Sequence, residues 1–294
     1  MKWTHHKLET GAGGRHLSVT NASVNIIFVG GISDDTERYL HALERLLPDQ
    51  AHIWTLDLRG FGLSSGATPG HFGHNGSQLI VQDITALCQK INNPHPTVII
   101  GHSTGALFSL LALKSLPKPP EAIILSSAGL PPRWEIQLAS LLFTFQKWTL
   151  GAKGISPWIR ERTTLKYALE LQLPPDADWR TEDPQVLESL SDYQSTHIEA
   201  TVGSWCDILK SLKQLSNGIH HIPEVRCLLI GGADDPSTQF GVSVNRLSNT
   251  LVQADWTCFH RFITGARHDI WNGKVGEQSR EAVHKFLNNF LSQG

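Results

Sequence analysis

The chain has 294 residues and a formal net charge of −2, with 40% apolar and 18% charged residues. This is the composition of an ordinary globular protein that is long enough to bury a sizeable core. Lysine and arginine form no run, so the sequence argues against a nucleic-acid partner, which requires a concentrated positive surface.

Cysteine spacing and hydropathy exclude further classes. The four cysteines are far apart and form no C-x-x-C pair: Cys88, Cys206, Cys227 and Cys258. This spacing favours neither a disulfide framework nor a metal site, so we expect reduced thiols. No run approaches the roughly 18 apolar residues of a membrane-spanning helix, and residues 1–10 lack the apolar region of a signal peptide. We therefore expect a soluble, cytoplasmic protein without a transmembrane segment.

The first half of the chain alternates between β-rich runs and amphipathic stretches. The predicted strands are Asn25–Val29, His52–Leu58, Thr97–Ile100 and Ala122–Ser126, with Leu17–Val19 as a candidate antiparallel edge strand before them. The predicted helices between them are Thr36–Leu47, Ser77–Ile91 and Gly105–Leu116. This alternation predicts an α/β fold, in which helices cover both faces of a mostly parallel central sheet.

The second half interrupts and then resumes this pattern. The strand-like runs Arg226–Ile230 and Phe259–Ile263 are followed by a predicted helix at Glu277–Leu291. Residues 131–221, which precede these runs, are helix-like and rich in tryptophan and contain no convincing strand. We therefore predict a core of residues 1–130 and 222–294 and a helical cap insertion of residues 131–221. Such an insertion usually covers the carboxyl ends of the strands, where ligands bind.

The strongest local motif is a strand-to-helix turn. The run Thr97–Ile100 leads into GHSTG (residues 101–105), and an apolar helix pattern follows at once. A serine in this G-x-S-x-G setting projects its hydroxyl from the sheet edge, and the glycines permit the close backbone approaches of the turn. The helix N-terminus directs N–H groups at developing negative charge. The motif indicates Ser103 as a catalytic nucleophile; the alternative is a purely structural turn.

Ser103 needs a base, because an unassisted hydroxyl is a poor nucleophile at neutral pH. In this kind of fold an acid and then a histidine follow the serine along the chain. Asp235 is the candidate acid, since it lies in a glycine-rich turn after a strand, and neighbouring Asp234 is the alternative. His268 is the candidate base, since it follows the last strand and precedes the last helix.

The chain has 15 histidines, so position decides which of them is the base. His260 falls inside a strand pattern, and His220–His221 precede the penultimate strand. Surface or structural roles are the simpler interpretation for these residues. We therefore retain His268.

Several segments together resemble one known family. They are VGGISDDTERY (29–39), LDLRGFGLSSG (56–66), IGHSTGA (100–106), GGADDPST (231–238) and GARHDIWN (265–272). The chain thereby resembles the monoacylglycerol lipase and lysophospholipase-like branch of the α/β-hydrolases, also named serine aminopeptidase S33 or Hydrolase-4. The D-x-R-G-x-G-x-S string at residues 57–64 and the G-A-R-H string at residues 265–268 are its more specific parts. The resemblance implies an α/β-hydrolase fold and aligns Asp235, before Pro236, with the family's catalytic acid.

The resemblance also implies an oxyanion hole made by the backbone N–H groups of Ile32 and Thr104. The sequence departs from the family here, because Gly30 replaces the usual histidine. Only backbone donors are needed, so we expect the chemistry to survive. Asp269 in place of the family's more usual glutamate is a milder change. Further candidates for substrate contact are Gly31, His102, Trp134 and Trp205.

The implied mechanism is a two-step acyl transfer. His268 takes the Ser103 proton as the hydroxyl oxygen attacks an ester carbonyl, and later activates the water that hydrolyses the acyl-enzyme. Asp235 fixes the tautomer of the imidazole. We expect no metal and no organic cofactor.

The predicted cap indicates the kind of substrate. It holds five of the nine tryptophans, and Trp134–Leu150 is apolar over more than one helical stripe. We expect these faces to be buried rather than to touch a membrane, because basic residues do not frame them. Residues 178–205 resemble the family's cap, and their carboxylates predict solvated helix faces. The expected partner is a small-molecule ester or lipid-like substrate with an apolar acyl group and a small alcohol.

The three candidate residues leave other functions open. A thioesterase, an amidase or peptidase, and a C–C hydrolase use the same triad, because the pocket decides the leaving group. Outside the enzymes, the alternative is a non-catalytic member of the fold that binds a small ligand. Dehalogenases and epoxide hydrolases are disfavoured, since they carry aspartate where this chain has Ser103.

Overall fold

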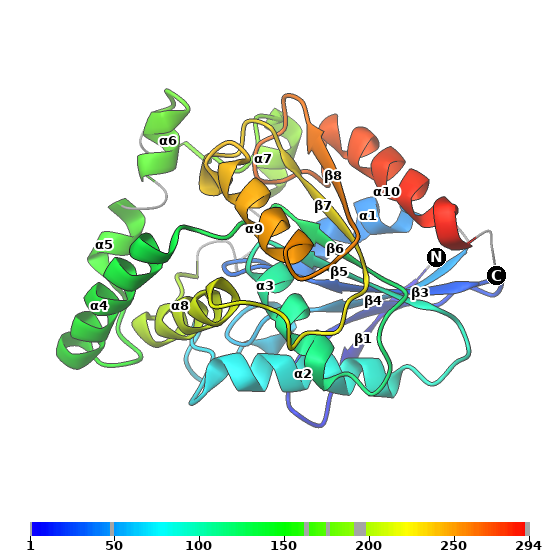
Figure 1. The fold of residues 1–294 in the computed structure, drawn as a ribbon, viewed down its shortest axis with the longest axis horizontal. Coiled ribbons are helices and arrows are strands. Elements are labelled where there is room, and N and C mark those ends of the chain that lie inside the picture. The colour runs from blue at the N-terminus through cyan, green and yellow to red at the C-terminus, as the bar shows by residue number, and fades with distance from the viewer. Residues whose placement is uncertain (1, 48–49, 162–164, 175–176, 191–197, 292–294) are drawn as a thin grey trace.

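The computed structural model describes residues 2–47, 50–161, 165–174, 177–190 and 198–291 (Figure 1). Their strands form one sheet in the order β1-β2-β4-β3-β5-β6-β7-β8. The strands are β1 Trp3–Lys7, β2 Gly13–Leu17, β3 Val24–Val29, β4 Ala51–Leu56, β5 Thr97–His102, β6 Ala122–Ser126, β7 Arg226–Gly232 and β8 Cys258–Ile263. The β1–β2 and β2–β4 pairs are antiparallel and the other pairs are parallel. The predicted mostly parallel sheet is confirmed.

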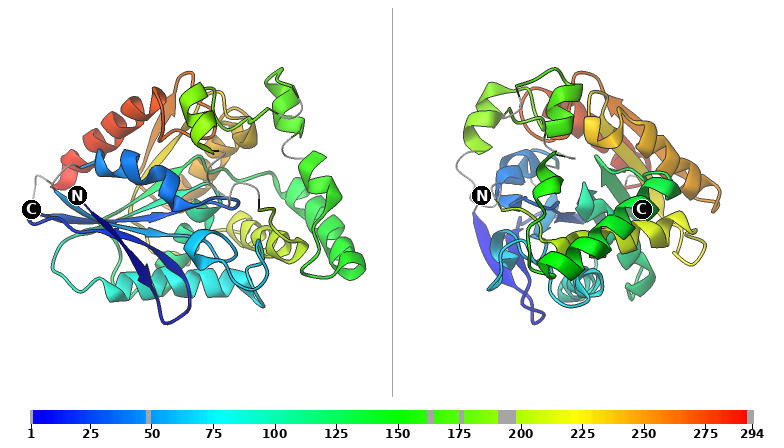
Figure 2. Two further views of the ribbon diagram at one scale, coloured as in Figure 1. Left: turned by 180° about the vertical axis from the view of Figure 1, so that it is seen from behind. Right: turned by 90° about the vertical axis from the view of Figure 1, so that its left-hand side faces the viewer.

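Helices cover both faces of this sheet (Figure 2). They are α1 Leu40–Glu44, α2 Gly76–Lys90, α3 Thr104–Ala112, α4 Arg133–Leu150, α5 Pro157–Arg160, α6 Lys166–Glu170, α7 Pro184–Leu190, α8 Val202–Ser216, α9 Val242–Val252 and α10 Val275–Leu291. Short 3-10 turns lie at Thr36–Tyr39, Gly62–Ser64, Leu113–Ser115 and Pro236–Thr238. Buried side chains of α2, α3, α8 and α9 belong to the apolar cluster on one face, and those of α1 and α10 to the cluster on the other.

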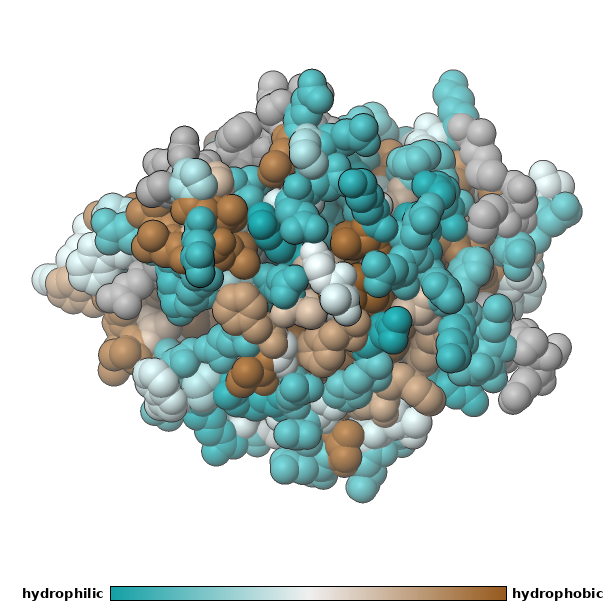
Figure 3. Space-filling view, turned by 90° about the horizontal axis from the view of Figure 1, so that it is seen from above, coloured by the Kyte–Doolittle hydropathy of each residue, from teal (hydrophilic) through white to brown (hydrophobic). Residues whose placement is uncertain are grey.

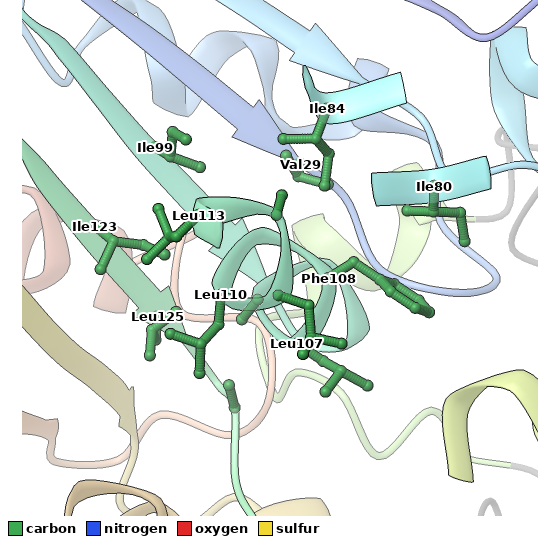
Figure 4. Close-up of a cluster of buried hydrophobic side chains, with 14 of the residues drawn as sticks. Val29, Ile80, Ile84, Ile99, Leu107, Phe108, Leu110, Leu113, Ile123 and Leu125 are labelled. Atoms are coloured by element: carbon green, nitrogen blue, oxygen red, sulfur yellow. The ribbon is translucent and has the colours of Figure 1, made fainter. Parts of the chain in front are cut away.

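The side chains of the central strands alternate between these two clusters. In β3, Ile27 and Val29 enter one cluster, while Ile26 and Phe28 enter the other. All six residues of β3 are buried, as expected of a parallel strand covered on both faces. In Figure 4 the side chains of α3 lie among those of β3, β5, β6 and α2. The helix that follows Ser103 is therefore firmly embedded in the core.

The expected elements differ from the observed ones mainly at one sheet edge. The pattern does not predict β1, and β2 begins four residues before the expected Leu17–Val19. Both strands are polar or glycine-containing, and pairing holds them in place. Gly14 is needed in β2, because an added Cβ would lie 1.9 Å from the Thr55 oxygen. Helix α9 is also absent from the prediction, and the expected helix at Thr36–Leu47 is a 3-10 turn followed by short α1.

The D-x-R-G-x-G-x-S string ties two loops together. Asp57 accepts hydrogen bonds from Thr36 N at 2.9 Å, Thr36 Oγ1 at 2.6 Å and Leu63 N at 2.8 Å. Gly62 leaves room for the carboxylate, since a Cβ there would lie 2.4 Å from Asp57 Oδ2. The buried carboxylate thus fixes the segment after β3, which contains the candidate oxyanion residues.

Helices α4 to α8 lie between β6 and β7, and their described residues contain no strand. In Figure 1, α4, α5 and α6 project from the sheet at the left-hand side. The division into a core and a helical cap insertion stays a prediction. None of the helices in the described ranges is long and apolar enough to cross a membrane.

Helix α4 exposes much of its apolar surface. Ile136 and Gln146 are its buried residues, whereas five large apolar side chains are 57% to 82% exposed. These five are Trp134, Leu138, Leu141, Phe145 and Trp148. Apolar side chains gather at the same end of the molecule in Figure 3. The expectation that this stretch is buried is therefore wrong for one of its faces, because α4 packs against α8 on one side only.

A row of imidazoles crosses the antiparallel edge of the sheet. His16 on β2 stacks on Trp54 of β4 with ring centroids 3.6 Å apart, and the His52 ring lies 6.1 Å away. Burial, together with His52 and His6, lowers the pKa of His16 to about 4. The His16 imidazole therefore binds a proton less readily in the folded protein than in the unfolded chain.

We expect His16 to contribute to a loss of stability in acid. Between its ordinary pKa of 6.5 and the folded value of about 4, the unfolded chain binds a proton that the folded chain does not. The free energy of unfolding must then fall as the pH is lowered through this range. His16→Asn removes this contribution, so its urea midpoint should depend less on pH than that of the wild type. His5→Asn is the matched control, because His5 is exposed on β1. An equal pH dependence of the urea midpoint in His16→Asn and the wild type would contradict the role of His16.

Candidate active site

Ser103 occupies a sharp turn between β5 and α3. Its backbone has φ 53° and ψ −122°, which a non-glycine residue rarely adopts. Flanking glycines allow the turn, because an added Cβ at Gly101 would lie 2.4 Å from an α3 Cα atom. One at Gly105 would lie 2.3 Å from a backbone oxygen of the loop after β3. The G-x-S-x-G spacing is thus a requirement of close packing around a strained serine.

Asp235 and His268 come from the ends of neighbouring strands β7 and β8. Their loops pack backbone to backbone, since a Cβ at Gly232 would lie 2.1 Å from the Arg267 oxygen. His268 Nδ1 lies 2.9 Å from Asp235 Oδ2. The Asp235 side chain is fully buried and that of His268 is 12% exposed. An ionised carboxylate can only accept, so Nδ1 carries the hydrogen and Nε2 is left as an acceptor, as a general base requires.

The alternatives to this acid and base lie elsewhere. Asp234 is exposed, although it neighbours Asp235. His260 is exposed on β8, where its Nε2 bonds to the hydroxyl of Ser248. His220 and His221 are exposed before β7. The structure therefore pairs Asp235 with His268 and places Ser103 and His268 on the lining of the same cavities, while the other candidates lie elsewhere.

The loop after β3 passes directly over the nucleophile. An added Cβ at Gly31 would lie 3.2 Å from Ser103 Cβ and 3.7 Å from its Oγ. Ile32 and Thr104 line the same cavity as Ser103, and Thr104 opens α3, where the first N–H groups lack helical partners. Both expected oxyanion donors thus lie in segments next to the nucleophile.

The departure at Gly30 has a local explanation. An added Cβ at this position would lie 2.9 Å from Thr36 Cγ2. Thr36 is itself fixed by hydrogen bonds to Asp57. A histidine side chain therefore does not fit here unless Thr36 moves.

A buried ion pair joins the loop after β3 to the loop that carries the base. Arg38 Nη2 lies 2.5 Å from Asp269 Oδ2, and Arg38 Nη1 lies 3.2 Å from Asp34 Oδ1. Tyr39 Oη donates to the other oxygen of Asp34 at 2.8 Å. Burial alone would raise the pKa of the Asp269 carboxyl, but Arg38 and hydrogen bonds including one from Asn272 hold it below its usual value. Asp269 is thus a charged anchor directly after His268.

Two cavities meet at Ser103. The first, of about 590 Å³, is lined by charged and aromatic residues that include Asp178, Trp179, Arg180 and Glu199. We call it the polar cavity. The second, of about 760 Å³, lies between α3, α4, α8 and α9, and its lining includes Leu110, Leu142, Phe143, Ile208 and Leu212. We call it the apolar cavity. The residues that line both are Ser103, Thr104, Tyr167, Trp205, Ser237 and His268.

The predicted substrate contacts have different outcomes. Gly31 lines the polar cavity, Trp205 lines both cavities, and Trp134 lines the apolar cavity while 63% exposed. His102 borders the polar cavity but is only 2% exposed, and its Nδ1 lies 3.1 Å from Ser126 Oγ. Burial and the nearby His268 lower the pKa of His102 to about 3. A neutral His102 adds no charge that would oppose protonation of His268.

Three residues at the site are not predicted from the sequence. The Trp179 ring lies 5.1 Å from the His268 ring, and Tyr167 meets Trp179 edge to face at 4.7 Å. Ser237 lies 2.9 Å from His268 Nδ1. The two aromatic residues come from the helical insertion, whose composition does not show which of its aromatic side chains lie near His268. The sequence could have indicated Ser237, because it lies two residues after the candidate acid Asp235. In the described part of the chain, no group of three His, Cys, Asp or Glu residues could hold a metal ion.

Comparisons with known proteins identify the family and the fold. A family model described as Hydrolase_4, serine aminopeptidase S33, matches residues 20–274. No curated protein matches the chain. Similar solved structures include a highly thermostable carboxyl esterase from Bacillus coagulans in complex with glycerol, at 18% identity and TM-score 0.85 over 99% of each chain. The monoacylglycerol lipase of Paleococcus ferrophilus matches at 18% identity and TM-score 0.69 over 100% of each chain.

A third similar structure belongs to a protein with a different name, so structural similarity alone does not identify the activity. The bromoperoxidase of Bacillus anthracis matches at 14% identity and TM-score 0.66, over 97% of this chain and 100% of that one. The name of this protein denotes a different activity from those of the esterase and the lipase. These structures therefore show an α/β-hydrolase fold, and the activity has to be argued from the site.

We expect Arg38 to be needed for stability. Arg38→Met leaves Asp34 and Asp269 buried without their cation, at side-chain exposures of 6% and 3%. Removing one partner of a buried pair lowers the free energy of unfolding by about 3 kcal/mol or more. Arg45→Met is the control, because its pair with Glu277 is exposed and contributes less than about 1 kcal/mol. Urea unfolding of both variants measures the difference, and equal losses would refute the role of Arg38.

Proposed function

Because the chain belongs to the Hydrolase_4 (serine aminopeptidase, S33) family, we propose that it is a serine hydrolase that cleaves carboxylic esters of apolar acids. The observation that carries this proposal is the hydrogen bond between Asp235 and His268 at 2.9 Å, beside a strained serine where two cavities meet. A turn with only a structural role would not need an imidazole and a cavity in front of its hydroxyl. We propose Ser103 as nucleophile, His268 as base and Asp235 as acid.

The reaction proceeds by acyl transfer. His268 Nε2 accepts the hydroxyl proton of Ser103 while Oγ attacks the ester carbonyl, and the backbone N–H groups of Ile32 and Thr104 hold the oxyanion. His268 then gives the proton to the leaving alkoxide. A water that passes a proton to His268 attacks the acyl-enzyme, and collapse of the second intermediate returns that proton to Ser103 and releases the acid. Asp235 stabilises the imidazolium in both steps.

The apolar cavity supports an apolar acyl group. Its volume of about 760 Å³ and its aliphatic and aromatic lining suit a chain or branched group that is buried from water. Helix α4 supplies one wall, with Leu142 and Phe143 in the lining. The acyl carbon would sit at Ser103, where this cavity opens.

The polar cavity supports a neutral alcohol as leaving group. Its arginines are already paired, Arg38 with Asp34 and Asp269, and Arg180 with Asp178 at 2.5 Å. Among the described residues that line it, no unpaired arginine or lysine is present to hold a phosphate. A glycerol-like alcohol therefore fits better than the anionic headgroup of a lysophospholipid. The cytoplasmic location stays a prediction from the sequence.

The nucleophile and base are tested with an active-site probe. A fluorophosphonate should label the wild type, and Ser103→Ala should not be labelled. His268→Ala should lose at least about 1,000-fold in kcat on a p-nitrophenyl ester, because the serine then lacks its base. His260→Ala is the matched control and should keep wild-type turnover. A folded wild type that is not labelled would instead favour a ligand-binding protein, and inactivity of His260→Ala alone would reassign the base.

The acyl cavity is tested with glyceryl monoesters from butyrate to laurate. Leu142→Trp narrows the apolar cavity, so the laurate-to-butyrate ratio of kcat/KM should fall about tenfold as about two methylene groups lose burial. Leu141→Trp on the same helix is the matched control, since Leu141 is 72% exposed and lies outside the lining. An unchanged ratio in Leu142→Trp would place the acyl group elsewhere. Faster turnover of a lysophosphatidic acid than of the glyceryl ester with the same acyl group would contradict the neutral leaving group.

A further inference from the structure

Ser237 contacts both the acid and the base. Its Oγ lies 2.7 Å from Asp235 Oδ1 and 2.9 Å from His268 Nδ1. The same Nδ1 lies 2.9 Å from Asp235 Oδ2. Nδ1 of His268 thus has two oxygen neighbours at equal distance.

Counting hydrogens fixes the direction of these bonds. The buried carboxylate of Asp235 only accepts, so the single hydrogen of the Ser237 hydroxyl goes to Oδ1. The hydroxyl oxygen can then only accept from His268. The Nδ1–H of His268 is therefore shared between Asp235 and Ser237 in a three-centre hydrogen bond, a common arrangement in proteins.

Two contacts disfavour the tautomer of His268 that carries its hydrogen on Nε2. If Nε2 carried the hydrogen, the lone pair of Nδ1 would face the carboxylate oxygen of Asp235. The hydroxyl of Ser237 would then have to leave Asp235 in order to donate to Nδ1. Both contacts therefore favour the tautomer in which His268 Nε2 can take a proton from Ser103.

Local backbone structure holds the hydroxyl in this place. Asp235 caps a 3-10 turn, with Pro236 in its first position and Ser237 N donating to Asp235 Oδ1 at 2.9 Å. The turn ends with Gln239 and Phe240 at φ 54° and 53°, a strained pair. The turn thus places the backbone of Ser237 independently of the imidazole, and the contact with Asp235 Oδ1 orients its hydroxyl.

We propose that Ser237 is a positioning residue of the hydrolase, a second acceptor that keeps His268 in its catalytic tautomer and orientation. The inference rests on the proposed function, because it acts through His268. Ser237 borders both cavities, but its role is toward the imidazole rather than toward the substrate. Its hydroxyl shares the Nδ1–H in the wild type and becomes the main acceptor when the carboxylate is removed.

The proposal predicts non-additive kinetics. Ser237→Ala should lower kcat about threefold with KM nearly unchanged, since Asp235 still accepts the Nδ1–H. In an Asp235→Ala background the same change should lower kcat about thirtyfold, because the hydroxyl there is the acceptor for a charged imidazolium. The rate of fluorophosphonate labelling should fall by the same factors, and Ser237→Thr, which keeps the hydroxyl, should behave like the wild type in both backgrounds. An equal factor in the two backgrounds, or no effect in either, would overturn the proposal.

A spectroscopic measurement separates this proposal from the proposed function. The imidazole ¹⁵N shifts of His268 report its tautomer without any turnover. The Nδ1–H tautomer should dominate in the wild type and in Ser237→Thr, and its share should fall in Ser237→Ala, where Asp235 alone accepts the Nδ1–H. An unchanged share of the Nδ1–H tautomer in Ser237→Ala would refute the role of Ser237, even in an enzyme that labels normally. A wild type that fails to label would refute the hydrolase function alone.

Discussion

The strained backbone of Ser103 is the constraint on which the rest of the site depends. A left-handed φ of 53° at a non-glycine residue persists only when the surrounding structure holds it. Here β5 on one side and α3 on the other are both buried in the core, and Ser103 N donates to the Ser126 oxygen of neighbouring β6 at 2.7 Å. The core therefore holds the turn that brings the hydroxyl to the mouth of two cavities.

Parallel pairing brings the remaining groups to the same edge. The loops after β3, β7 and β8 carry the candidate oxyanion segment, acid and base, and these parallel strands all end at the same edge of the sheet. Buried polar contacts then fix their relative positions. Arg38 joins the first loop to Asp269, and Ser127 Oγ donates to the His268 oxygen at 2.7 Å. Stability and site geometry consequently share the same residues, so a change in one of these contacts affects both.

The sequence predicts most of the sheet and the three central residues, because each leaves a local pattern. Ser103 lies between a β-branched run and an apolar helix, and His268 follows the last strand. The exposed face of α4 cannot be read in this way, since an apolar helix pattern does not say how many neighbours the helix has. The path of the helical insertion brings Trp179 to His268 and Tyr167 to Trp179, and periodicity does not encode that path. Strand β1 lacks an apolar signal because pairing with β2 and polar contacts of its side chains, such as Trp3 Nε1 to Glu44, hold it.

Positions 30 and 36 illustrate a further property of this architecture. The methyl group of Thr36 fills the space that a side chain at residue 30 would need, and Asp57 prevents Thr36 from withdrawing. Exchanging either residue alone creates a collision or a void, whereas a joint exchange can preserve the packing. We therefore expect the two positions to be epistatic, so that a side chain at position 30 requires a paired substitution at position 36.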